Sequence, residues 1–424
     1  MVTRFIRLLI AACTLAPFGP VNADTREVVR EMAALIENNY FDPDKANEIA
    51  RELRAAERAG AFAKHADPRD LAVALTARLK ASDRHFNVVW VPAPASRPTL
   101  GADEVSGAGP FIGRSSGIRS VAMLAGSVGY IDMRSLPYIS FRESNDPARL
   151  AADSALQLVS GAAAVILDLR YAIGGYPEMA GYIVSAFTAP DADIYNVFHG
   201  RGERESERPK QLYHSPKVDV PLYVLVSGST ASAAESTAYT LQAAKRAIIV
   251  GERTSGAANP GGMLPVGDGF NVFISNSTPI NPITGTNWEG NGVQPDIAMP
   301  VEGALERVHI LALQHVLKER QTSAPREVHW ALEYLTTKGQ PQAATALEEY
   351  LGSYADAIVS TTDGALSVRR QRHPALRLRQ LRGDTYMVVD EPSLRVVFER
   401  GRGNAVSGFQ VLRASGYSIW HPRQ

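Results

Sequence analysis

The chain contains a single cysteine, Cys13, among its 424 residues. A disulfide framework, a cysteine-rich zinc site and a cysteine nucleophile are therefore excluded for the remainder of the chain. Neither sign of charge is in excess, because 44 Lys and Arg residues balance 44 Asp and Glu residues. This balance argues against a nucleic-acid partner bound through overall charge. No apolar run is long enough to span a bilayer, so we expect no stable membrane insertion.

Motifs for metals and nucleotides are also missing from the sequence. There is no His-Glu-x-x-His motif, no carboxylate-rich loop and no cysteine cluster. Residues 24–168 lack a glycine-rich motif that could cradle a phosphate. The sequence therefore predicts a protein with no cofactor and no metal.

Residues 1–23 are typical of a signal peptide. Arg4 and Arg7 precede a short apolar run, and residues 21–23 (VNA) fit the small-residue rule for signal cleavage. We expect a periplasmic or secreted protein from which this segment is removed. Lipoprotein anchoring at Cys13 is the alternative.

Periodicity divides the remaining chain into four predicted parts. Apolar residues at helical spacing predict an N-terminal helical cap over 24–92. Alternating strands and helices predict an α/β core with a largely parallel sheet over 93–320. A helical connector is expected over 321–350. Short alternating runs separated by turn residues predict a small antiparallel β domain over 351–424.

The most informative segment of the core joins an apolar strand, 222–226, to a helix that begins near Ser232. A serine at this place can attack a carbonyl while the Ala233 amide and the positive end of the helix stabilise developing negative charge. The same residues also fit a capping box, in which Ser232 and Glu235 satisfy amides at the helix start. From these residues alone, both interpretations stay open.

A second turn follows the buried strand that ends at residues 168–170 (DLR). Gly174 and Gly175 come next and present bare backbone amides. Ligands of parallel sheets bind beyond the carboxyl ends of the strands, where this turn is expected. The alternative is a tight strand-to-helix turn without a further role.

Four short motifs occur in order at suitable spacings. They are DLR…GG at 168–175, TASAAE at 230–235, VGERTSG at 250–256 and GVQPD at 292–296. Together they resemble the tail-specific, or C-terminal-processing, serine peptidase family. The branch that they resemble contains the tricorn core protease and the repeats of the interphotoreceptor retinoid-binding protein. The resemblance covers about residues 24–301 and implies a crotonase/ClpP-like β-α spiral core.

The resemblance also implies roles for individual residues. Ser232 would be the nucleophile. The oxyanion hole would consist of three backbone amides, those of Gly174, Gly175 and Ala233. The processing branch would carry a lysine base where this chain has Ala257, and no lysine occurs between residues 246 and 295. The lysine dyad is therefore absent.

A histidine replaces the lysine in the tricorn-like branch. Residues 82–86 (SDRHF) resemble its Asp-x-His element, which makes His85 the candidate base. Histidine suits this task because its ordinary pKa lies near neutrality. Glu289, three residues before Gly292, resembles the family acid that orients the base. The alternatives are an ordinary surface histidine at position 85 and a solvated loop carboxylate at position 289.

Two positions depart from the family pattern. Arg84 stands where the tricorn-type site has a serine, and Ala172 stands where the family has an asparagine. We predict an exported serine hydrolase, a peptidase that cleaves peptides or unfolded proteins through an acyl-enzyme at Ser232, His85 and Glu289. The alternative is a catalytically decayed peptidase fold that binds an apolar ligand or peptide.

Overall fold

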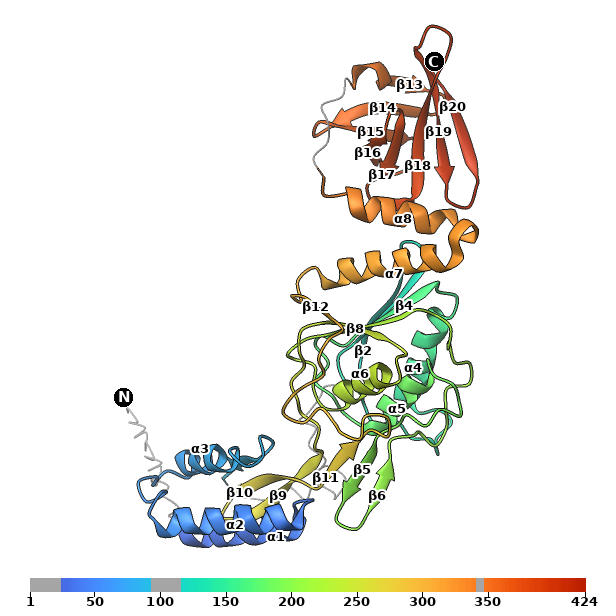
Figure 1. Cartoon of the computed structure of the whole chain (residues 1–424). Coiled ribbons are helices and arrows are strands. Elements are labelled where there is room, and N and C mark those ends of the chain that lie inside the picture. The colour runs from blue at the N-terminus through green and yellow to red at the C-terminus, as the bar shows by residue number, and fades with distance from the viewer. Residues whose placement is uncertain (1–23, 93–115, 341–346) are drawn as a thin grey trace, which may run out of the picture. The chain divides into compact units, whose positions relative to one another are not determined.

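The computed structural model describes residues 24–92, 116–340 and 347–424, and it divides into two compact units (Figure 1). Unit 1 combines the N-terminal residues with residues 261–277, and unit 2 holds the other described residues. The expected signal peptide, with Cys13, lies outside the described residues. Part of the expected helical connector, 341–346, does so too.

The described residues of unit 1 form three helices and a three-stranded antiparallel sheet. The helices are α1 (Thr25–Asn39), α2 (Pro43–Arg58) and α3 (Pro68–Leu79), and the strands are β1 (Asn87–Trp90), β9 (Gly261–Gly267) and β10 (Phe270–Ser275). Each helix begins after an aspartate whose carboxylate accepts a hydrogen bond from an amide of the first turn. Met32, Leu53 and Phe270 belong to the core that the helices and the sheet share.

The sequence placed residues 261–277 in the α/β core, whereas β9 and β10 form part of unit 1. Strand β10 lies between β1 and β9, with Asn87 opposite Phe273. The indole N–H of Trp90 also donates to the carbonyl of Asp268 at 2.8 Å. These pairings join segments almost two hundred positions apart, and no local sequence pattern predicts which strand pairs with which over such a separation.

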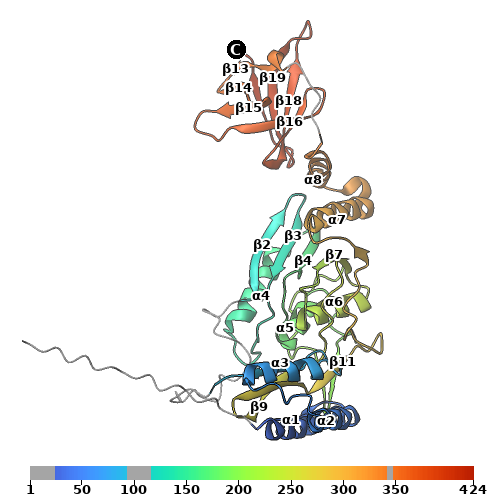
Figure 2. The ribbon, with the colours of Figure 1, turned by 90° about the vertical axis from the view of Figure 1, so that its left-hand side faces the viewer.

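Unit 2 is a mixed α/β structure built on a six-stranded sheet in the order β12-β8-β7-β4-β3-β2. Its strands are β2 (Ile118–Leu124), β3 (Val128–Met133), β4 (Ala164–Asp168), β7 (Leu222–Val226), β8 (Ile248–Gly251) and β12 (Ile297–Ala298). Neighbouring strands are parallel except at the edge, where β2 runs antiparallel to β3. Figure 2 shows β2, β3 and β4 side by side. The residues of β3, β4 and β7 are buried throughout, as expected for strands covered on both faces.

Helices cover both faces of this sheet. They are α4 (Pro147–Leu158), α5 (Pro177–Ser185), α6 (Ala233–Ala243), α7 (Ala304–Arg320) and α8 (Arg326–Thr337). Side chains of β4 alternate between two cores: Leu167 packs in the core that contains residues of α4, α5 and α6, and Ile166 packs in the core that contains residues of α7 and α8. A smaller sheet in the order β11-β5-β6 completes this part, with β5 (Val197–Gly200), β6 (Arg204–Ser206) and β11 (Ser277–Ile280).

The C-terminal residues form an eight-stranded antiparallel sheet in sequential order. Its strands are β13 (Gly352–Tyr354), β14 (Ala357–Thr362), β15 (Ala365–Arg370), β16 (Leu376–Arg382), β17 (Thr385–Val388), β18 (Glu391–Arg400), β19 (Val406–Arg413) and β20 (Ser418–Pro422). A bridge between Tyr354 and Arg423 joins the first strand to the end of the last, which closes the sheet around its own apolar core. Two short 3₁₀ turns, η2 (Gln321–Ser323) and η3 (Glu348–Tyr350), lie in the connecting segments.

Across the described ranges, no helix combines the length and apolar character needed to cross a membrane.

Arg395 connects the closed sheet to helix α8. Its side chain is 2% exposed and donates to the carbonyl of Trp330 at 3.0 Å. The guanidinium also pairs with Glu333 and lies 4.7 Å from the Trp330 ring centre. A buried cation in such contacts leaves unpaired groups behind when it is removed.

Replacement of Arg395 by alanine should therefore lower the free energy of unfolding by about 2–3 kcal/mol. Urea unfolding measures this loss. Arg377→Ala is the matched control, because Arg377 pairs with Asp390 between side chains that are 60% and 72% exposed. That change should cost under about 0.5 kcal/mol. Equal losses in the two variants would contradict the assigned role of Arg395.

Candidate active site

Two turns meet beyond the carboxyl ends of the neighbouring parallel strands β4 and β7. The Thr230 hydroxyl donates to the carbonyl of Leu169 at 2.8 Å. The N–H of Ala231 donates to the carbonyl of Ala172 at 3.0 Å. These bonds hold the turn that leads to Ser232 against the turn that leads to Gly174.

Ser232 has a backbone conformation that non-glycine residues rarely adopt. Its φ is 54° and its ψ is −127°, at the residue immediately before helix α6. An ordinary N-cap serine has a negative φ in the extended region. Conformations in sparsely populated regions cost of order 1–3 kcal/mol and are concentrated at functional sites. Ser232 therefore lies in a strained strand-to-helix turn, and its side chain is partly exposed.

Glu235 holds the strained turn in place through hydrogen bonds to its carboxylate. The carboxylate is fully buried and accepts hydrogen bonds from the N–H groups of Ser232 at 2.9 Å, Gly256 at 2.6 Å and Ala257 at 2.8 Å. The Thr254 hydroxyl donates to it as well. Glu235 thus makes the capping contact that the sequence allowed, and it also holds the loop in which the processing branch would carry its lysine.

Gly174 lies in direct contact with the Ser232 turn. Its φ is +98°, and a Cβ at this position would lie 2.6 Å from the Ser232 Cβ and 3.2 Å from the Ala233 nitrogen. Only glycine fits so close an approach. Among the described residues, no hydrogen bond uses the N–H groups of Gly174, Gly175 or Ala233. The structure thus brings Gly174 and Ala233 to the candidate nucleophile with amides available for an oxyanion.

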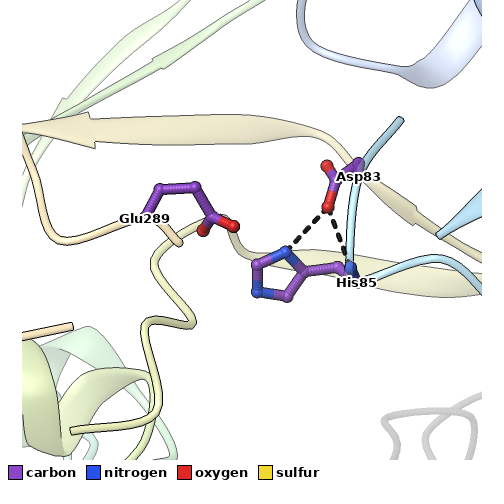
Figure 3. A group of neighbouring side chains, drawn as sticks. All are labelled: Asp83, His85 and Glu289. Carbon is purple, nitrogen blue, oxygen red and sulfur yellow. Dashed lines mark hydrogen bonds and ion pairs between the residues drawn. The ribbon is translucent and has the colours of Figure 1, made fainter. Parts of the chain in front are cut away.

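His85 and Asp83 form a pair within unit 1 (Figure 3). The Nδ1 atom of His85 lies 2.9 Å from Asp83 Oδ1, and the backbone N–H of His85 donates to the same oxygen at 2.8 Å. Tyr40 and Ser275 donate to the other carboxylate oxygen at 3.1 and 3.0 Å. With a proton on Nδ1, the neutral imidazole carries its lone pair on Nε2, as a general base requires.

Asp83 is the site residue to which the sequence assigned no role. Burial alone would raise the pKa of this carboxyl, but hydrogen bonds from the His85 side chain and backbone, the charge of His85 and the Ser275 hydroxyl lower it to about 2. An ionised acid is therefore held against the imidazole. The Asp-x-His spacing was the available signal, and it pointed to Asp83 as well as to His85.

Glu289, the third residue labelled in Figure 3, belongs to unit 2. Its carboxylate accepts hydrogen bonds from the N–H groups of Ala258 at 2.8 Å and Asn259 at 3.3 Å. Within its own unit, Glu289 is therefore bound to the loop after Ala257. It is a partly buried carboxylate with backbone partners.

The departures from the family pattern have defined surroundings. Arg84 is exposed, and Ala172 is completely buried, where its carbonyl holds the N–H of Ala231. Within each unit taken alone, the part of the chain that the structure describes contains no metal-binding cluster of three or more His, Asp or Glu side chains.

Comparison with known proteins decides the family relationship of the core. Residues 127–299 match the model of peptidase family S41. This segment is related to peptidase family S41. The segment contains Ser232, Gly174 and Glu289, and the predicted relationship to C-terminal-processing serine peptidases is confirmed for it.

Two curated relatives illustrate the relationship. Carboxyl-terminal-processing peptidase 1 (chloroplastic) of Arabidopsis thaliana is 30% identical over 164 residues, which cover 38% of this chain and 33% of that protein. The carboxyl-terminal-processing protease of Synechocystis sp. is 32% identical over 150 residues, which cover 35% and 33%. The chain thus spans about a third of the length of the curated relatives that it matches.

The solved structures that this chain matches include the photosystem II D1 C-terminal processing protease. That likeness covers 72% of this chain and 100% of the other, at 18% identity and a TM-score of 0.43. The tricorn protease covers 70% of this chain at 12% identity and a TM-score of 0.43, over 37% of its own length.

The strain at Ser232 yields a stability prediction. Ser232→Gly should raise the free energy of unfolding by about 1 kcal/mol relative to wild type, because glycine adopts a positive φ without steric cost. Chemical denaturation measures the change. A serine that serves only as a helix cap would instead lose a few tenths of a kcal/mol on replacement by glycine.

The pKa of Asp83 yields a prediction for acid stability. Its value of about 2 in the folded protein lies below the ordinary 3.8, so ionised Asp83 stabilises the fold above about pH 4. Between about pH 4 and pH 2, wild type should lose about 2 kcal/mol of unfolding free energy that Asp83→Asn does not lose. Urea titrations at several acidic pH values measure the difference. Parallel pH dependences of the two proteins would contradict the assigned interaction.

Proposed function

We propose that this chain is an exported serine peptidase that cleaves peptides or unfolded proteins through an acyl-enzyme. The observation that carries the proposal is the positive φ of Ser232 at the start of helix α6. A serine that only caps the helix does not need this conformation, because N-cap residues ordinarily have a negative φ. A nucleophile gains a hydroxyl that projects from a sharp strand-to-helix turn toward a substrate.

In this proposal, the Ser232 hydroxyl attacks the scissile carbonyl, and backbone amides of Gly174, Gly175 and Ala233 bind the resulting oxyanion. The contact between Gly174 and the Ser232 turn supports this role. Donors of this kind contribute about 3 kcal/mol each to transition-state stabilisation. The N-terminus of α6 favours the same negative charge.

His85 is the proposed base, because the loop after Ser232 has Ala257 in place of a lysine. Its pairing with Asp83 supports this role, since a buried carboxylate on Nδ1 fixes the tautomer and favours the imidazolium that forms during catalysis. We assign the orienting role to Asp83. Glu289 remains in the proposal as a second acid that stabilises the imidazolium.

The proposal extends to the architecture and to the location of the protein. The core, 93–320 without residues 261–277, would be a crotonase/ClpP-like β-α spiral, with 24–92 as its cap, 321–350 as a connector and 351–424 as an accessory β domain. Residues 1–23 would direct export to the periplasm or out of the cell and would then be removed. Its partner there is a peptide or unfolded protein, without nucleic acid.

A second candidate function is the binding of an apolar ligand or peptide by a catalytically decayed peptidase fold. Three departures favour it: Ala257 offers no lysine, Arg84 replaces the serine beside the histidine, and Ala172 replaces the family asparagine. This candidate predicts saturable binding without turnover.

Turnover of a fluorescently labelled, unfolded casein separates the two candidates. Wild type should cleave it, and Ser232→Ala should lower kcat by about 10⁴-fold or more. His85→Gln and Asp83→Asn should each lower kcat by about 10³-fold or more, because each removes or misorients the base. Ser229→Ala is the matched control, since Ser229 is an exposed serine of the same turn and should leave kcat unchanged. Full activity in Ser232→Ala would refute the proposal, and binding without cleavage by wild type would favour the second candidate.

A further inference from the structure

Four large apolar side chains are exposed around the turn that carries Gly174 and Gly175. The exposed fractions are 54% for Tyr138, 48% for Tyr171, 64% for Ile173 and 39% for Tyr176. We propose that Tyr138 and Tyr176, with Ile173 opposite, form an apolar subsite that binds an aromatic or large aliphatic side chain of the substrate beside the scissile bond. This inference rests on the proposed peptidase function and specifies its substrate class.

The backbone fixes Tyr138 and Tyr176 together next to the proposed oxyanion donors. The N–H of Leu136 donates to the carbonyl of Gly174 at 2.8 Å, and the N–H of Tyr176 donates to the carbonyl of Leu136 at 2.7 Å. The rings of Tyr138 and Tyr176 then meet edge to face, with centres 5.5 Å apart. Such a pair is a rigid apolar surface, so little conformational entropy is lost when a ligand binds to it.

The other side of the turn is equally well held. The N–H of Ile173 donates to the carbonyl of Arg134 at 3.2 Å. The guanidinium of Arg134 is ion-paired with Asp132 at 2.8 Å and covers one face of the Tyr171 ring at 4.6 Å. Because the Arg134 guanidinium covers one face of the Tyr171 ring, Ile173 is the apolar side chain on this side of the turn that is available to a ligand.

The position of these residues next to the proposed oxyanion donors identifies a substrate side chain as their ligand. Gly174 touches Ser232 and Ala233, so a carbonyl bound at these amides lies beside residues 173–176. Consecutive Cα atoms are about 3.8 Å apart, which puts Ile173 and Tyr176 within two residues of the proposed donors on either side. We therefore expect a peptide that reacts at Ser232 to place a neighbouring side chain over them.

The test compares two peptides that differ only beside the cleaved bond, with phenylalanine in one and alanine in the other. Mass spectrometry of a digested peptide mixture first identifies a bond that wild type cuts. Wild type should then cleave the phenylalanine peptide with a kcat/KM about 20-fold above that of the alanine peptide. The double variant Tyr138→Ala/Tyr176→Ala should reduce this ratio to about threefold or less, mainly through a higher KM for the phenylalanine peptide.

Four further proteins keep the result interpretable. Tyr417→Ala removes a ring that is 61% exposed in the turn between β19 and β20, and it should change the kcat/KM of neither peptide. Tyr138→Phe/Tyr176→Phe keeps the rings and should keep the preference. Ser232→Ala allows binding to be measured without turnover. By fluorescence anisotropy, it should bind the phenylalanine peptide more tightly than the alanine peptide. Addition of Tyr138→Ala/Tyr176→Ala to this variant should abolish that difference in affinity.

The outcomes separate this inference from the peptidase proposal. Cleavage without a preference, or with a preference that the double variant retains, overturns the subsite and leaves the peptidase intact. Binding preference without any cleavage supports the subsite and overturns the peptidase. Absence of both cleavage and binding preference overturns both.

Discussion

The candidate active site depends on the hydrogen bonds that the buried carboxylate of Glu235 accepts. It binds the N–H of Ser232 and, from the other side, the N–H groups of Gly256 and Ala257. A carboxylate stripped of water needs such donors, and the start of helix α6 adds its positive end. The strained conformation of Ser232 persists because one charged group ties the turn and the following loop together.

The parallel sheet supplies the second half of this arrangement. Strands β4 and β7 are neighbours, with Val165 opposite Leu222, so the turns that follow them meet at one edge. The carbonyls of Leu169 and Ala172 hold the turn that leads to Ser232. Because Gly174 has no side chain, its backbone reaches Ser232 and Ala233. The candidate nucleophile and the backbone amides are thus brought together by sheet topology, at the place where ligands of parallel sheets bind.

Local patterns predicted the parts of the structure that depend on neighbours in the sequence. Apolar runs such as 222–226 and the small residues before Ser232 indicated a strand, a turn and a helix start. The pairing of Asn87 with Phe273 has no local signal, so the membership of β9 and β10 in unit 1 was missed. Glu235 was fully explained by helix capping, which left no reason to expect its second role. Asp83 was visible in the Asp-x-His spacing, but its contacts with Tyr40 and Ser275 require the fold.

The central claim is that the turn before α6 presents a reactive nucleophile. The most direct test is reaction of the wild-type protein with a fluorophosphonate, followed by peptide mapping with mass spectrometry. The account predicts one stoichiometric adduct on Ser232, and no adduct after Ser232→Ala. An adduct on a different serine, or an unmodified Ser232 under conditions that label a control serine peptidase, would contradict it.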